Sequence, residues 1–248
     1  MRVSHCIAHL LIVCSFAVHA EPLTIAVASN FRSAAEELAG VYSETTGEDW
    51  RISSASTSKL YSQIRSGAPF DVFLAADSKH PQLLEQAGIA IEGSRRSYAI
   101  GGLVLWSRDS SLASGDCRAA LDRLGKRRLA IANPRTAPYG NAARQFLVTA
   151  GLWERVEPRL VYGESIGQAM QFAATGNAQL GIVAASQVGN PDLPKATCAW
   201  KVPAELHEPI EQQLVLLSNK KAALAFADFL GGEKARAILQ DFGYGVPE

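Results

Sequence analysis

Small hydroxyl and amide side chains stand at four places where a predicted strand gives way to a predicted helix. No Lys or Arg stands within these junctions, which are Ser29-Asn30, Ser56-Thr57, Tyr139-Gly140-Asn141 and Ser165-Ile166. The N-terminus of a helix presents unpaired backbone N–H groups and about half a positive charge. Several such ends that converge on one point can bind an anion without a cationic side chain. The four junctions therefore predict an anion site made of neutral donors.

Neutral donors suit one class of anion in particular. A fully ionised oxyanion carries no proton to donate, so hydrogen-bond donors alone can satisfy it. This chemistry favours molybdate, tungstate or sulfate over hydrogen phosphate. Ser, Thr and Asn before a helix are also ordinary caps that need no ligand, so capping remains the alternative at each single junction.

The elements that must position these residues alternate along the chain. Apolar runs predict strands over 23–28, 50–53, 70–75, 98–107, 128–132, 158–162, 180–184 and 213–218. Helical patterns fall over 31–42, 59–66, 81–87, 117–124, 141–150, 166–175, 222–231 and 233–242, with a turn-rich loop over 133–140 and a Pro-containing connection over 189–205. Strands alternating with helices predict an α/β fold with mainly parallel sheets.

The order of these elements indicates a middle segment inserted into a discontinuous first domain. We expect one lobe to comprise residues 21–100 and 208–248 and the other residues 101–207. In doubly wound sheets ligands bind at the carboxyl ends of the strands, where the four junctions lie. The ligand is therefore expected between the lobes.

The first twenty residues have the pattern of a secretory signal peptide. Arg2 supplies a positive charge, residues 10–18 are apolar, and Val18-His19-Ala20 is typical of a cleavage site. The apolar run is far shorter than the roughly 20 residues of a membrane-spanning helix, and Val13 before Cys14 does not fit a lipoprotein signal. We expect a protein exported to the periplasm, with no membrane insertion.

Net charge bears on nucleic-acid binding, and the cysteine content bears on disulfide formation and metal binding. The chain has 24 basic and 24 acidic residues, and loss of Arg2 with the signal leaves a net charge of −1. A chain with this net charge lacks the excess of basic residues that nucleic-acid binding requires. Cys117 and Cys198 remain after export, and without nearby Cys or His partners a disulfide is favoured over a metal site.

Five segments resemble the periplasmic molybdate-binding protein family of molybdate ABC transporters. They occur in the family's order and extend over essentially the whole mature chain: Thr24-Ile25-Ala26-Val27-Ala28-Ser29-Asn30-Phe31, Ser56-Thr57-Ser58-Lys59-Leu60-Tyr61-Ser62-Gln63-Ile64, Gly67-Ala68-Pro69-Phe70-Asp71-Val72-Phe73-Leu74-Ala75-Ala76-Asp77, Leu129-Ala130-Ile131-Ala132-Asn133-Pro134 and Leu180-Gly181-Ile182-Val183. The resemblance implies a two-lobed type II binding protein that closes over molybdate or tungstate. It also implies transient delivery of the anion to a membrane permease by a monomer that has no cofactor and is no enzyme.

The resemblance also implies roles for particular residues. Molybdenum would be bound only as the oxyanion. Ser29 and Thr57 match hydroxyl ligands of the family, and Ser56 is the alternative to Thr57 for the second of these. Asn30 would add a donor, and Tyr139 and Ile166 match positions where a backbone N–H binds the anion. Ala184 departs from the family, because some members have a tyrosine there whose hydroxyl reaches the anion; Tyr139 or Asn30 would have to compensate. Asp71 and Asp77 fit structural capping better than ligand binding, since a carboxylate opposes a dianion.

Three other functions remain as alternatives. A sulfate receptor would use the same neutral donors. Gly163-Glu164-Ser165-Ile166-Gly167 matches the nucleophile-elbow pattern of serine hydrolases, with Asp192 and His207 following in triad order, but Asp192 lies in a Pro-rich connection. A metal-ion receptor would have only His80 and His207 as histidine ligands in the mature chain, and no carboxylate cluster of ligand spacing accompanies them.

Overall fold

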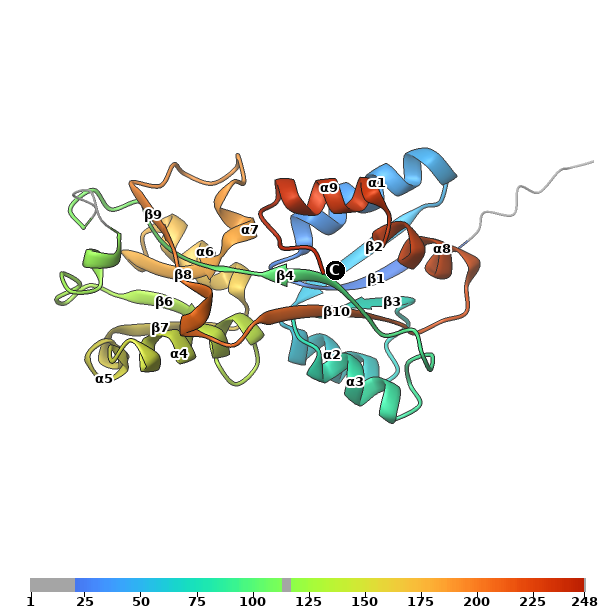
Figure 1. The fold of residues 1–248 in the computed structure, drawn as a ribbon, viewed down its shortest axis with the longest axis horizontal. Helices are drawn as coiled ribbons and strands as arrows, with labels where there is room; N and C mark the ends of the chain where they lie inside the picture. The colour runs from blue at the N-terminus through green and yellow to red at the C-terminus, as the bar shows by residue number, and fades with distance from the viewer. Residues whose placement is uncertain (1–20, 113–116, 248) are drawn as a thin grey trace, which may run out of the picture.

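The computed structural model describes residues 21–112 and 117–247, which form two lobes lying side by side (Figure 1). Each lobe is built on its own five-stranded sheet. The sheet of lobe 1 has the order β2-β1-β3-β10-β4, with the strands β1 (Leu23–Ala28), β2 (Trp50–Ala55), β3 (Val72–Leu74), β4 (Arg96–Gly101) and β10 (Ile210–Leu216). β1 runs parallel to β2 and β3, whereas β10 is antiparallel to β3 and β4.

Lobe 2 repeats this plan with the strand order β7-β6-β8-β5-β9. Its strands are β5 (Leu103–Ser107), β6 (Leu129–Ala132), β7 (Leu160–Gly163), β8 (Leu180–Ala184) and β9 (Cys198–Lys201). β6 is parallel to β7 and β8, and β5 pairs antiparallel with β8 and β9. The predicted α/β fold with two lobes is confirmed.

Helices cover both faces of the lobe 1 sheet, because successive side chains of a strand point to opposite faces. Ile25 and Val27 of β1 pack in the cluster under three of the helices, whereas Ala26 between them packs in the cluster under the other two. On the first face lie α1 (Arg32–Thr46), α8 (Lys221–Leu230) and α9 (Glu233–Asp241), and on the second lie α2 (Thr57–Arg65) and α3 (Lys79–Gln86) (Figure 1).

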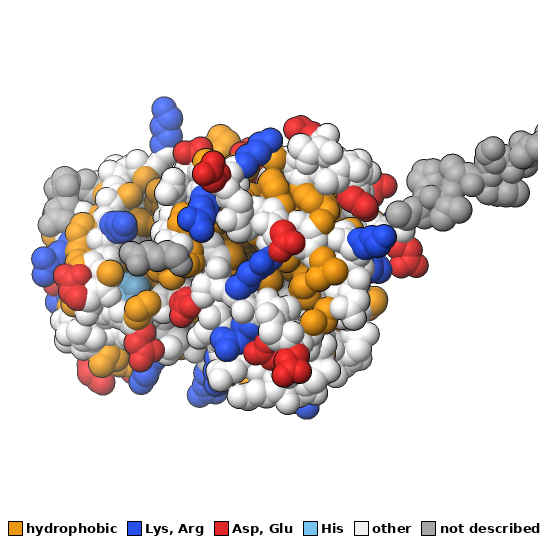
Figure 2. Space-filling model, turned by 45° about the vertical axis from the view of Figure 1, so that its right-hand side comes forward, with side chains coloured by type: hydrophobic (Ala, Val, Ile, Leu, Met, Phe, Trp, Pro, Cys, Tyr) orange, Lys and Arg blue, Asp and Glu red, His pale blue; other side chains and the backbone are white. Residues whose placement is uncertain are grey.

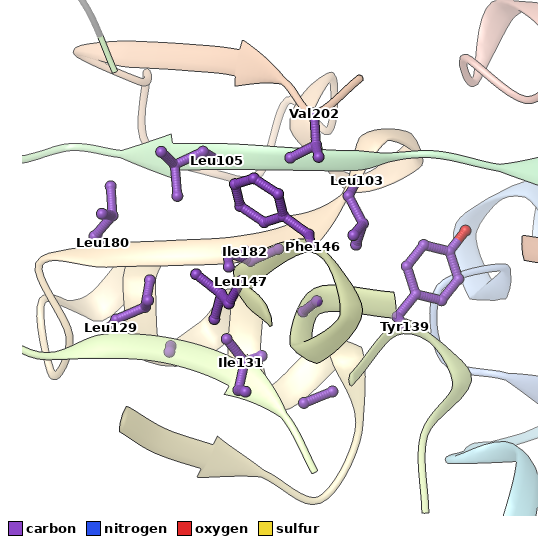
Figure 3. Packing of buried hydrophobic residues seen from close by; sticks show 14 of the residues in the cluster. Leu103, Leu105, Leu129, Ile131, Tyr139, Phe146, Leu147, Leu180, Ile182 and Val202 are labelled. Carbon is purple, nitrogen blue, oxygen red and sulfur yellow. The ribbon is translucent and has the colours of Figure 1, made fainter. Parts of the chain in front are cut away.

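The core of lobe 2 follows the same rule. Leu103 and Leu105 of β5 pack with Phe146 (Figure 3). Val104 and Trp106 pack on the opposite face in a separate cluster. The helical segments of this lobe are η1 (Arg118–Ala120), α4 (Pro138–Thr149), α5 (Trp153–Val156), η2 (Glu157–Arg159), α6 (Ile166–Thr175), α7 (Ala185–Val188) and η3 (Ala204–Leu206). No helix among the described residues is long and apolar enough to cross a membrane.

Two extended segments connect the lobes. The chain leaves lobe 1 between β4 and β5 and returns between β9 and β10 (Figure 1). The prediction of one strand over 98–107 is therefore wrong. Gly102 interrupts the strand, and the residues on its two sides pair with different sheets.

Two other predictions of secondary structure are wrong in lobe 2. The expected helix over 117–124 is reduced to the single 3₁₀ turn η1, since one short segment cannot offset the cost of helix nucleation. The expected connection over 189–205 contains the edge strand β9. Cys117 and Cys198 form a disulfide, with their Cα atoms 5.3 Å apart, that ties the η1 segment to this edge strand.

Helix starts differ from the predictions in a way that affects the candidate site. α2 begins at Thr57 instead of Lys59, after an extended Ser56, and α4 begins at Pro138 instead of Asn141. Proline is favoured in the first turn because it needs no hydrogen-bond partner for an N–H group. Thr57 and Tyr139 therefore lie in the first turns of their helices. The predicted signal peptide, residues 1–20, lies outside the described residues.

Candidate oxyanion site between the lobes

The four junctions singled out in the sequence face one another across the gap between the lobes. The N–H of Gly167, in the first turn of α6, donates to Ser29 Oγ at 3.2 Å. The N–H of Ser58 in α2 donates to the carbonyl of Thr136, just before α4, at 3.3 Å. Asn30 Nδ2 lies 3.5 Å from the hydroxyl of Tyr139. The structure thus brings the predicted residues of lobe 1 next to those of lobe 2.

The hydroxyl groups of Ser29 and Thr57 are held in the same way. Ser29 Oγ accepts the N–H of Gly167, and Thr57 Oγ1 accepts the N–H of Ala76 at 3.1 Å. A hydroxyl has one hydrogen to donate and two lone pairs that accept. Both oxygens are therefore fixed through a lone pair, and each hydroxyl hydrogen remains available for a ligand.

Backbone N–H groups at three helix N-termini supply further donors. Thr57 and Ile166 are the first residues of α2 and α6, and Tyr139 is the second residue of α4. N–H groups in the first turn of a helix have no acceptor within that helix. The positive ends of three helix dipoles therefore add to the two hydroxyl groups.

Gly140, beside Tyr139, is required because the start of α4 lies very close to the end of β6. A Cβ on Gly140 would lie 2.3 Å from the carbonyl oxygen of Ala132 at the end of β6. Only a glycine lets α4 start so close to that strand. This packing fixes the position of the Tyr139 N–H relative to the sheet.

The side chains of Asn30 and Tyr139 point away from the donors just described. Asn30 Nδ2 donates to Gln212 Oε1 at 2.7 Å and to the Tyr244 hydroxyl at 3.2 Å. The ring of Tyr139 leaves the apolar core of lobe 2, with its hydroxyl toward the other lobe (Figure 3). Asn30 and Tyr139 are almost fully buried, with 4% and 1% exposure. Asn30 can then serve the site through its backbone.

Ser56, Ser165 and Ile166 occupy the positions expected from the sequence. Ser56 is the extended N-cap residue of α2, is 7% exposed and makes no side-chain capping bond. Ser165 is the N-cap of α6 and accepts the N–H of Gln168. Ile166 is buried behind the first turn, so only its backbone can face the gap. A cavity of about 290 Å³ opens beside them, lined by both lobes at Ser56, Ser58, Lys59, Ser62, Asn133, Thr136 and Glu164.

Ala184, where the resemblance implies a departure from the family, is fully buried at the end of β8. Its methyl group offers no donor, and its backbone N–H is taken by Gln187 Oε1 at 3.2 Å. The hydroxyl of Tyr139 and the amide of Asn30 are engaged with each other and with Gln212. The amide hydrogens of Asn30 are thus donated within the protein, whereas the Tyr139 hydroxyl only accepts in these contacts and keeps its hydrogen.

The two buried tyrosine hydroxyls near the site are neutral over the physiological range. Burial raises the pKa of the Tyr139 and Tyr98 hydroxyls well above the usual range, so both stay protonated. Asp71 lies at the start of β3, where it accepts hydrogen bonds from Thr24 and Ser218, and Asp77 accepts the N–H of His80 at 3.0 Å. On the face shown in Figure 2 charges of both signs are interspersed.

The residues of the hydrolase alternative are not assembled. Ser165 Oγ caps α6, His207 Nδ1 pairs with the carbonyl of Glu208 at 2.7 Å, and the Asp192 N–H bonds to Asn190. Within residues 21–112 and 117–247, no three His, Cys, Asp or Glu side chains are grouped to hold a metal ion. His80 instead lies between Asp77 and Ser58.

Four residues near the site were not among the residues predicted for it. Gly167 holds Ser29, and Ser186, Gln212 and Tyr244 surround Asn30. Each belongs to an element far along the chain from its partner. No local pattern could have indicated these contacts.

The chain is similar to known proteins over most of its length. A family model described as bacterial extracellular solute-binding protein matches residues 23–245. The chain is 45% identical over 233 residues to molybdate-binding protein ModA of Azotobacter vinelandii, covering 93% of this chain and 92% of the relative. It is 42% identical over 222 residues to ModA of Rhodobacter capsulatus, covering 88% and 86%. The solved structure of the Azotobacter vinelandii periplasmic molybdate-binding protein superposes with a TM-score of 0.85 at 39% identity, covering 91% of this chain and 100% of that one.

Proposed function

This chain belongs to the bacterial extracellular solute-binding proteins, and within them to the molybdate-binding proteins, and on that premise we propose that it captures molybdate or tungstate for an ABC importer. It is a component of transport and not an enzyme. Molybdenum is carried as the oxyanion and is not a cofactor. The proposed ligand set comprises the hydroxyls of Ser29 and Thr57, with Ser56 beside them, and the backbone N–H groups of Asn30, Tyr139 and Ile166.

The observation that carries the proposal is the way the two hydroxyls are held. Ser29 and Thr57 each accept a backbone N–H from a neighbouring segment, so both hydroxyl hydrogens can be donated to a ligand. Helix N-termini from both lobes add backbone donors. A doubly charged oxyanion without protons matches such a set, because it offers only acceptors.

We further propose that capture proceeds by closure of the two lobes. The proposed lobes are residues 21–100 with 208–248 and residues 101–207, with the crossings near Gly101 and Ile210. The anion would bind one lobe first, and closure would add donors from the other. A monomer exported to the periplasm would then present its closed form transiently to the permease.

Isothermal titration of the mature, ligand-free protein tests the proposal. Molybdate and tungstate should each bind at one site per chain, and hydrogen phosphate should release no heat. Sulfate is the informative competitor, since it would use the same donors and differ only in size. Absence of heat with molybdate and tungstate would refute the proposal, and stronger binding of sulfate would assign the site to that anion.

A further inference from the structure

A buried polar cluster joins the two lobes directly behind the turn that carries Ser29. We name Asn30, Tyr139, Ser186, Gln212 and Tyr244 the interlobe cluster. Asn30, Gln212 and Tyr244 belong to lobe 1, whereas Tyr139 of α4 and Ser186 of α7 belong to lobe 2. All five residues are at most 9% exposed.

Tyr244 contacts both lobes through its hydroxyl oxygen. Its hydroxyl lies 2.8 Å from the carbonyl oxygen of Asn30 and 2.9 Å from Ser186 Oγ. Ser186 Oγ in turn donates to the same carbonyl at 3.1 Å. A carbonyl oxygen has two lone pairs, so it can accept from both hydroxyls at once. The three groups form a triangle across the lobe boundary, in which the carbonyl accepts from both hydroxyls and the Tyr244–Ser186 contact carries no hydrogen of its own.

The segment that carries Tyr244 is attached to the crossing between the lobes. Gly245 exchanges two backbone hydrogen bonds with Ile100 of β4, of 2.7 and 2.9 Å. Ile100 precedes the residues at which the chain passes into lobe 2. The C-terminal segment therefore holds the Tyr244 side chain close to the hinge.

Burial makes the triangle dependent on closure. Burial raises the pKa of the Tyr244 hydroxyl, which keeps its proton at any physiological pH. A hydroxyl or carbonyl buried without a partner costs free energy, so these groups stabilise the arrangement in which all are paired. Separation of the lobes would remove Ser186 from the other two.

We infer that Tyr244 is a positioning residue of the oxyanion site, one that fixes the turn carrying Ser29 and stabilises the closed arrangement through Ser186. Its hydroxyl holds the carbonyl of Asn30, the neighbour of Ser29, and Ser29 itself meets Gly167 of lobe 2. The inference rests on the proposed function in taking Ser29 as a ligand donor. Its effect on closure exists without a ligand.

Tyr244→Phe tests the inference, because it removes the hydroxyl and keeps the ring. The ring of Tyr244 packs edge-on against Phe31 at a centroid distance of 5.3 Å, and phenylalanine can keep that contact. We expect small-angle X-ray scattering to show a larger mean radius of gyration for the ligand-free variant. Molybdate should dissociate from it roughly fivefold faster, as expected for loss of one buried hydrogen bond.

Tyr98→Phe is the matched control. The ring of Tyr98 packs on the same Phe31, at 4.7 Å, and its hydroxyl is also buried. That hydroxyl contacts the carbonyl of Ala75 at 3.1 Å and Oε1 of Gln212, a member of the interlobe cluster, at 3.2 Å, but both contacts lie within lobe 1 and neither crosses the boundary. Its loss should lower the free energy of unfolding in urea without changing the radius of gyration or the dissociation rate.

Ser186→Ala completes the experiment as a double-mutant cycle. If Tyr244 acts through Ser186, the effect of Tyr244→Phe on the dissociation rate should be much smaller when Ser186 is already alanine. Equal effects in both backgrounds, or a Tyr98→Phe variant that opens as much as Tyr244→Phe, would overturn the inference. If the unaltered protein binds no oxyanion, the proposed function fails by itself, and the radius of gyration of the ligand-free variants still decides the role of Tyr244.

Discussion

At the level of single residues, the candidate site depends on where each hydroxyl finds its partner. Ser29 and Thr57 use a lone pair for a backbone N–H and keep a hydrogen for the anion. A side chain that needed an acceptor within the protein would not have that hydrogen to give.

Replacement of Ser29 or Thr57 by alanine should therefore weaken oxyanion binding. The expected loss is about 1–3 kcal/mol for each variant, because an acceptor of the bound anion would be left unpaired. Titration calorimetry with molybdate measures it. Ser66→Ala, at the exposed far end of α2, is the control and should bind like the unaltered protein. Unchanged affinity in both site variants would contradict the assignment.

Asp71 shows a carboxylate used for structure. Burial alone would raise its pKa, but hydrogen bonds from the Thr24 N–H and hydroxyl, the Ser218 hydroxyl and Lys220 outweigh burial and lower the pKa below the usual value. The ionised form is thus favoured in the folded protein. Its stabilisation is present above the unfolded pKa of about 4 and is lost as the pH falls through the lower folded value.

Asp71→Asn should accordingly lower the free energy of unfolding by about 2 kcal/mol at pH 7, the scale of hydrogen bonds to a charged group. The difference from the unaltered protein should shrink as the pH falls below about 4. Urea unfolding at several pH values measures both effects. Asp228→Asn is the control, since that exposed carboxylate pairs with Arg96 at the surface and should contribute under about 1 kcal/mol. A pH-independent difference would contradict the role of the Asp71 charge.

At the level of elements, the site depends on how closely helices start against strands. Gly140→Ala would place a Cβ 2.3 Å from the Ala132 carbonyl oxygen, so the N-terminus of α4 must move. We expect molybdate affinity to fall at least about tenfold, because the Tyr139 N–H moves with the helix. Gly40→Ala in α1 is the matched control, since nothing lies within 4 Å of its added Cβ. That control should gain about 0.5–1 kcal/mol in stability and bind normally, and equal binding by both variants would disprove the constraint.

The disulfide between the η1 segment and β9 stabilises lobe 2 across 81 residues of sequence. The cross-link lowers the conformational entropy of the unfolded chain, and for a loop of that length this adds about 4 kcal/mol to the free energy of unfolding. Replacing Cys117 and Cys198 together by serine should lower the melting temperature measured by calorimetry. Adding a reductant should lower that of the unaltered protein similarly and leave the double variant unchanged. A reductant effect on the double variant would show a different cause.

At the level of the whole molecule, the two segments that connect the lobes are the proposed hinge. Molybdate should lower the radius of gyration and raise the melting temperature, because it binds donors that come from both lobes. At about a thousand times the dissociation constant the ligand should add about 4 kcal/mol to the free energy of unfolding. Scattering and calorimetry measure the two effects, with hydrogen phosphate as the control. Stabilisation without compaction would contradict closure.

Much of this architecture could be predicted from the sequence. Most strands and helices were predicted from the spacing of apolar residues, because that spacing reflects which side chains of a segment are buried. They failed at residues 98–107, where an apolar run broken by Gly101 and Gly102 is shared between two sheets, and at β9, a short edge strand within a segment rich in proline. Strand pairing depends on partners that lie far apart in the chain, and local composition does not encode them.

The sequence by itself determined which residue types stand at the strand-to-helix junctions, because a strand, a turn and a helix start are local events. Only the tertiary structure decided which of their atoms are free. Ser29 is held by a residue 138 positions away, and Asn30 is bonded to one 214 positions away. A hydroxyl hydrogen or an amide N–H is available to a ligand only if no other group in the fold has taken it. That availability is a property of the packed lobes, and no local segment contains it.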